Sequence, residues 1–132
     1  MDCIKKEHKK FSKNSYGSFA LGCDIGGTNA KIGIFGVKKK PELLVSFHFR
    51  SKELKNLYSA INYSLDCMQE EHGIKITKAC FGAAGAVSPK RDYVHLTNAN
   101  LDLSTKELMK KTALKKILLM KDFEAVGYGI SM

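Results

Sequence analysis

The chain has 132 residues and a net charge of +9, and 44% of its residues are hydrophobic. This length suits a single domain with a substantial core, and the composition excludes a disordered or fibrous protein. The sequence has no apolar run long enough to cross a membrane. Its basic N-terminus also lacks the apolar segment of a secretory signal, so we expect a cytoplasmic protein.

Lysine supplies most of the positive charge, with clusters in residues 5–13 and 38–40. No aromatic side chains are interleaved with the second cluster, which argues against a nucleic-acid partner. The cysteines have no CxxC spacing and three of them lie in apolar segments, which predicts free thiols in a reducing compartment. They are Cys3, Cys23, Cys67 and Cys80. The four histidines are far apart and form no metal-ligand pattern.

The first half of the chain predicts a tail followed by three strands. Residues 1–18 are polar and lysine-rich, and we expect them to form a disordered basic tail. Apolar runs over residues 19–24 and 31–37 predict two buried strands. Alternate apolar residues then predict a third strand with one buried face. They are Leu43, Val45, Phe47 and Phe49. Short connections favour an antiparallel meander of these three strands.

An amphipathic helix is predicted after the third strand. Apolar residues recur at helical spacing between residues 54 and 68, which is typical of a helix that covers a sheet. Ser51 is the expected N-cap, and Gly73 is expected to end the helix.

The second half of the chain is expected to alternate between strands and helices. Ser104 and Glu107 form a capping box at the start of a second helix. The other expected elements are a strand over residues 77–84, a short strand over 92–96, a buried strand over 117–120 and a third helix over 123–130. This order predicts an α/β fold with a mixed five-stranded sheet, in which three antiparallel strands precede two parallel ones and helices pack on the sheet.

The turn between the first two strands has the composition of a phosphate-binding hairpin. Gly26 and Gly27 allow a tight reversal and bring backbone N–H groups close to an anion. Thr28 and Asn29 add side-chain donors, and Asp24 is placed to hold a metal ion beside that anion, directly or through water. The same pattern is also typical of a hairpin that binds nothing, and this alternative stays open on these residues alone.

Asp122 follows the predicted strand 117–120 and precedes the predicted third helix. It is a suitable N-cap for that helix, and the same carboxylate could accept a proton from a substrate hydroxyl. If the strands before Asp24 and Asp122 run parallel in one sheet, both carboxylates lie at the same edge. That juxtaposition favours a site for phosphoryl transfer.

Four segments resemble, in the same order, the motifs of bacterial-type glucokinases, which belong to the superfamily of actin and hexokinase. They are residues 24–31, 81–87, 96–98 and 119–126. The resemblance extends over residues 19–130, and it implies a ribonuclease H-like, actin-like ATPase domain. The implied reaction is the ATP-dependent phosphorylation of a hexose, glucose to glucose 6-phosphate, with Mg²⁺.

The resemblance also assigns roles to individual residues. It implies that Asp122 is the catalytic base and that Asp24 is the carboxylate associated with the metal. The residues implied to hold phosphate are Gly26, Gly27, Thr28, Asn29 and Lys31. Asn98, Lys121 and Asp122 match positions at the sugar.

Two departures from the family pattern matter. Lys121 replaces an asparagine that usually contacts the sugar, and a lysine donates hydrogen bonds but accepts none. The sequence also ends at residue 132, before the second domain of a complete glucokinase. We therefore expect an N-terminal domain over residues 19–132 that is inactive alone. It would need a missing C-terminal domain or a partner subunit, and a homodimer is a further arrangement to test.

Two other functions fit parts of the pattern. Nucleases of the Holliday-junction resolvase type share the fold, but they need three or four carboxylates around two metal ions, and residues 81–87 contain none. A non-catalytic sugar-binding module would fit Lys121 and the short chain.

Overall fold

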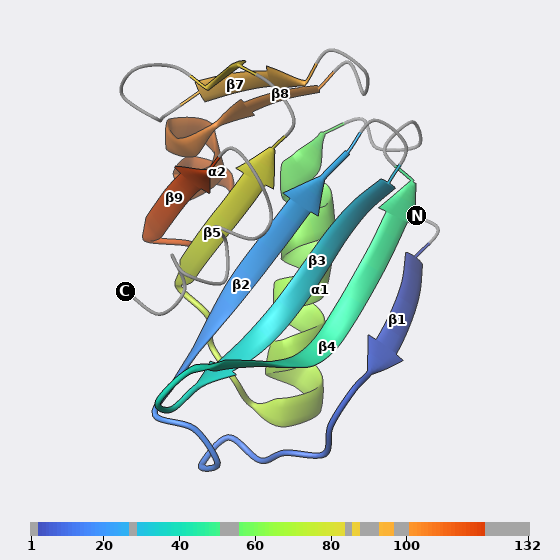
Figure 1. The fold of residues 1–132 in the computed structure, drawn as a ribbon, viewed down its shortest axis with the longest axis vertical. Helices are drawn as coiled ribbons and strands as arrows, with labels where there is room; N and C mark the ends of the chain where they lie inside the picture. The colour runs from blue at the N-terminus through green and yellow to red at the C-terminus, as the bar shows by residue number, and fades with distance from the viewer. Residues whose placement is uncertain are drawn as a thin grey trace.

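The computed structural model describes residues 3–26, 29–50, 56–83, 86–87, 93–96 and 101–120. Its centre is a six-stranded mixed sheet in the order β1-β4-β3-β2-β5-β9 (Figure 1). The strands are β1 (Cys3–Glu7), β2 (Ser18–Ile25), β3 (Asn29–Val37), β4 (Pro41–Arg50), β5 (Lys78–Ala83) and β9 (Lys116–Met120). A separate three-stranded sheet contains β6 (Ala86–Val87), β7 (Tyr93–Leu96) and β8 (Leu101–Ser104). The described helices are α1 (Leu57–His72) and α2 (Thr105–Lys111).

The sheet has an antiparallel half and a parallel half. Strands β4, β3 and β2 pair antiparallel, whereas β2, β5 and β9 pair parallel. This arrangement confirms the predicted three antiparallel and two parallel strands. The prediction of five strands is wrong, because β1 adds a sixth at the edge of the antiparallel half.

The prediction of a disordered tail over residues 1–18 is also wrong. Strand β1 pairs with β4 from Cys3 opposite Phe49 to Glu7 opposite Val45. Farther along, the Tyr16 side chain is buried, and its hydroxyl donates a hydrogen bond to Glu42 at 2.6 Å. An edge strand tolerates lysines because their charged ends reach water, so the apolar signal of a buried strand is missing from residues 3–7.

Strand β4 departs from the simple alternation that its sequence predicts. Val45 pairs with Ile34 while Leu43 pairs with Phe35, so Leu44 is an extra residue in a β-bulge. Leu44 and Val45 are both fully buried. The prediction that Leu43 shares the buried face of Val45 is therefore wrong, since the bulge moves Leu43 to the other face of the sheet.

Helix α1 covers one face of the sheet (Figure 1). Its N-cap is Asn56, whose side chain accepts a hydrogen bond from the Ser59 N–H at 3.0 Å, so the predicted cap at Ser51 is wrong. Gly73 ends the helix with φ = 65°, as predicted. The buried side of α1 completes the core with strand residues of the same sheet face. It consists of Leu57, Ala60, Ile61, Ser64, Leu65 and Met68.

Helix α2 begins as predicted. The Ser104 hydroxyl accepts a hydrogen bond from the Glu107 N–H. Strand β9 then returns the chain to the sheet beside β5. Residues 121–132, which include the predicted third helix, lie outside the described residues. Within the described part of the chain, neither helix is long and apolar enough to span a membrane.

Candidate active site

Three parallel strands end at the same edge of the sheet. Asp24 on β2 is level with Gly82 on β5, and Gly82 is level with Met120 on β9. Strands β2 and β9 are thus separated by one strand, or about 10 Å at the usual spacing of a sheet. The strands that precede Asp24 and Asp122 therefore run parallel in one sheet, as the prediction requires, and Asp122 itself lies outside the described residues.

The hairpin between β2 and β3 lies at this edge (Figure 1). The Gly26 N–H donates a hydrogen bond to the Asn29 carbonyl at 2.9 Å, which closes a two-residue loop. A Cβ atom at Gly26 would lie 3.5 Å from that carbonyl oxygen, an ordinary contact, and Gly26 has no positive φ. The backbone and the described neighbours of Gly26 therefore do not require glycine at this residue.

Four predicted site residues lie together at this edge, and five lie outside the described residues. Asp24, Gly26, Asn29 and Lys31 belong to the paired ends of β2 and β3. The five predicted residues of which the structure describes nothing are Gly27, Thr28, Asn98, Lys121 and Asp122.

Asp24 has a distinct electrostatic environment. Its neighbours Cys23 and Ile25 are buried among the core residues that pack with α1, so the alternation of β2 places Asp24 on the opposite face. Burial raises the pKa of Asp24 above its ordinary value of 3.8, and the positive charge of Lys31 partly offsets that rise. A single carboxylate fits Mg²⁺ when phosphate and water oxygens complete the coordination.

Two basic side chains near the hairpin were not predicted as site residues from the sequence. His48 lies opposite Lys31, and Arg50 lies opposite Asn29, both on the exposed face of β4. The period-two alternation of β4 was the available signal, because it predicts that residues 48 and 50 lie on the same face of that strand. Only the pairing of β4 with β3 brings them to the hairpin.

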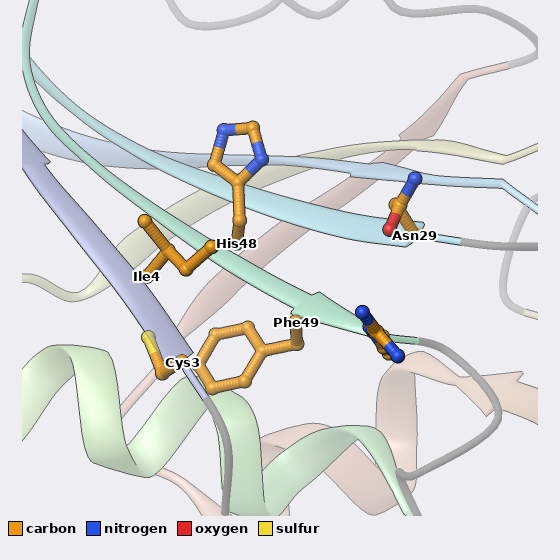
Figure 2. A pocket seen from close by; sticks show the side chains of 6 residues that line it. Cys3, Ile4, Asn29, His48 and Phe49 are labelled. Carbon is orange, nitrogen blue, oxygen red and sulfur yellow. The ribbon is translucent and has the colours of Figure 1, made fainter.

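An open pocket of about 600 Å³ lies beside the hairpin, between the ends of β1, β3 and β4 (Figure 2). Its lining residues are Cys3, Ile4, Asn29, His48, Phe49 and Arg50. Three of these side chains carry nitrogen donors, and none is a carboxylate.

A second cluster of polar groups lies far from the hairpin. Glu7, Glu71 and His72 have potential metal-ligand atoms within 4.8 Å of one another. The ammonium group of Lys5 makes ion pairs with Glu7 and Glu71, so a cation already occupies this cluster. The ion pair between Lys5 and Glu71 connects β1 to the C-terminal end of α1.

The sequence of this chain is similar to the sequences of known proteins. The family model described as Glucokinase matches residues 21–132. The glucokinase of Psychromonas ingrahamii is 27% identical over 107 residues, which are 81% of this chain and 31% of that protein. The chain therefore spans about a third of the length of the curated relatives it matches.

This chain is also similar in structure to solved glucokinases. The crystal structure of a glucokinase from an Antarctic psychrotroph has a TM-score of 0.69 and 26% identity, over 82% of this chain and 33% of that one. A glucokinase of the ROK family from Streptomyces griseus, solved with glucose and AMPPNP, has a TM-score of 0.57 and 24% identity, over 77% of this chain and 32% of that one. The fold is thus the actin-like, ribonuclease H-like one that the sequence predicts.

Proposed function

Because the chain belongs to the glucokinase family, we propose that it is the N-terminal part of an ATP-dependent hexose kinase that converts glucose to glucose 6-phosphate. The Streptomyces griseus relative, which was solved with glucose and AMPPNP, supports both substrates. The observation that carries the proposal is the parallel order of β2, β5 and β9. It brings Asp24 and the strand that leads to Asp122 to one edge of the sheet.

The hairpin is the proposed phosphate site. Backbone N–H groups of Gly26, Gly27 and Thr28 would donate to phosphate oxygens, and the Asn29 side chain would add a donor. Lys31, which lies opposite Asp24, would offset the negative charge of the phosphates.

Asp24 is the proposed residue for Mg²⁺, directly or through water. A bound Mg²⁺ would neutralise phosphate charge during transfer. Asp24 suits this role because its carboxylate lies beside the hairpin and makes no ion pair within 4 Å to any residue that the structure describes.

Asp122 is the proposed general base. Its carboxylate would accept the proton of the sugar hydroxyl as that oxygen attacks the terminal phosphate of ATP. Asn98 and Lys121 are proposed to bind the sugar. Lys121 can donate hydrogen bonds but not accept them, so we expect it to contact sugar oxygens through their lone pairs.

We further propose that residues 19–132 form one domain, with β1 added to its sheet, and that this domain is inactive alone. The remaining phosphate and sugar contacts would come from the other two thirds of the kinase, in the same chain or in a partner subunit. A cytoplasmic location would suit ATP as donor, and the four cysteines, all free, agree with a reducing compartment.

The test is hexose-dependent ADP formation by the polypeptide purified from its source cell, at its natural length. Asp122→Asn should lower kcat about 10²–10⁴-fold, because a positioned general base contributes that much. Asp66→Asn, at an exposed position of α1, is the control and should keep full activity. Full activity of Asp122→Asn would refute the base role. Absence of hexose-dependent ADP formation by the unmodified protein would refute the kinase.

A further inference from the structure

The pocket beside the hairpin combines nitrogen donors with one exposed apolar side chain. Figure 2 shows the His48 imidazole on one side of β4 and the Phe49 ring on the other. Ile4 also lines the pocket, and 73% of its surface is exposed. An isoleucine this exposed, in the wall of a pocket of about 600 Å³, offers apolar contact to a small molecule, and the volume lies in the range of ligand sites.

Positive charge converges on the same face of the sheet. Arg50 and Asn29 are cross-strand partners, as are His48 and Lys31. Within the described part of the chain, Arg50 has no ion-pair partner.

We propose that this pocket binds the phosphate monoester of a small ring compound, with Arg50 as its main contact to the phosphate. A guanidinium offers a planar pair of donors that matches two phosphate oxygens. Ile4, on the same face of the sheet as His48 and Arg50, would contact the ring. Two sources share this chemistry, a hexose phosphate and a nucleoside monophosphate.

The pocket would give the chain a regulatory site next to its phosphate hairpin. Asn29 lines the pocket and also closes the hairpin through its carbonyl. A ligand in the pocket would therefore contact a residue that the hairpin uses. This inference goes beyond the proposed kinase reaction and does not depend on it, because binding can be measured without turnover.

The test is calorimetric titration of this chain with glucose 6-phosphate, AMP, inorganic phosphate and glucose. At least one ester should bind more tightly than inorganic phosphate, and glucose should show no binding. The tighter ester identifies the source of the ligand. Absence of ester binding would overturn the proposal. Equal affinity for inorganic phosphate would also overturn it, because the apolar wall would then contribute nothing.

Two variants localise the ligand. Arg50→Gln should weaken ester binding about tenfold, through loss of a charge-assisted hydrogen bond. Lys40→Gln removes the same charge at the opposite end of the sheet, and should change the affinity less than about twofold because salt screens distant charges. Equal weakening by both variants would mean unspecific attraction and overturn the proposal.

Ile4→Asp provides the second check on the location. Because Ile4 is mostly exposed, this change should leave the fold intact, which circular dichroism can verify. It places a carboxylate in the pocket wall, so ester binding should be lost. Unchanged ester binding would mean that the ligand binds elsewhere, for example at the hairpin. This result would overturn the proposal that the pocket is the binding site. Failure of the kinase assay would leave all of these results unaffected.

Discussion

Asp24 and Lys31 lie directly opposite each other on the antiparallel strands β2 and β3, two residue pairs from the end of the hairpin. Both belong to the sheet face that α1 does not cover. The pair sets opposite charges beside the turn that we propose to hold phosphate, where the carboxylate would face the metal and the ammonium group the phosphate oxygens. The stability of the chain, the binding of nucleotide and the pKa of Asp24 should depend on these two residues.

Asp24→Asn should stabilise the chain at neutral pH. Since burial raises the folded pKa of Asp24 above 3.8, the ionised carboxylate costs stability once the pH exceeds that folded pKa. The cost develops as the pH rises from 3.8 through the folded pKa, and it is absent at lower pH, where the group is protonated in both states. Urea unfolding at pH 7 and pH 3 should show a gain for the variant only at pH 7.

The same substitution should weaken binding of the nucleotide with Mg²⁺. We expect a loss of about 10–100-fold, as for other carboxylates that orient a bound metal. Asp66→Asn is the control for both measurements, because its carboxylate is exposed on α1. A variant at residue 24 that is less stable at pH 7 would contradict the assigned burial cost, and unchanged nucleotide binding would contradict the metal role.

Lys31→Gln should raise the pKa of Asp24 further. The charge of Lys31 lowers that pKa, so its removal leaves the effect of burial unopposed. A carbon-detected NMR titration of the Asp24 carboxyl group measures the shift. Lys40→Gln, at the far end of the sheet, should leave the titration unchanged. A fall in the pKa of Asp24 after Lys31→Gln would show that the two charges do not interact as the pairing indicates.

Gly73→Ala should destabilise the chain by about 1–2 kcal/mol, the usual cost of left-handed backbone in a residue with a Cβ atom. Gly73 has φ = 65°, and a Cβ atom there would meet nothing within 4 Å, so the cost comes from the backbone alone. Gly17→Ala is the matched control, since its Cβ would make an ordinary contact at 3.7 Å without a positive φ. Equal unfolding midpoints for both variants would contradict the left-handed C-cap.

Gly36→Ala should cost about 1–3 kcal/mol through overpacking. A Cβ atom at Gly36 would lie 2.6 Å from the Tyr16 ring, and the Tyr16 hydroxyl is held by Glu42. The double variant with Tyr16→Ala should remove most of this added cost, which a double-mutant cycle of urea unfolding measures. Additive effects would mean that Tyr16 does not pack on Gly36.

Alkylation of the native chain should modify two cysteines. Cys23 and Cys80 are fully buried, and burial raises the pKa of Cys80 to about 11. Cys3 and Cys67 are partly exposed. Mass spectrometry after brief iodoacetamide treatment at pH 8 should locate adducts on Cys3 and Cys67 only, with all four cysteines modified in urea. Rapid labelling of Cys23 in the native chain would contradict its place in the core.

Features that depend on a few neighbouring residues could be predicted from the sequence. The stop at Gly73 and the cap at Ser104 are decided by backbone conformation and one side chain, and both are confirmed. The two predicted strands of the hairpin are confirmed as β2 and β3, because continuous apolar runs are typical of buried strands. The prediction of an N-cap at Ser51 is wrong. Asn56, five residues later, has an equally good capping side chain, and the sequence pattern does not distinguish between the two residues.

The sequence by itself determined the turn that follows Asp24, the parallel and antiparallel halves of the sheet and the family to which the chain belongs. Only the tertiary structure decided that residues 3–7 form a strand, that Leu44 is a bulge and that Arg50 lies beside Asn29. The physical reason is that strand pairing and register join residues far apart in the chain. The energy of an edge strand or a cross-strand pair depends on its partner, which no local pattern contains.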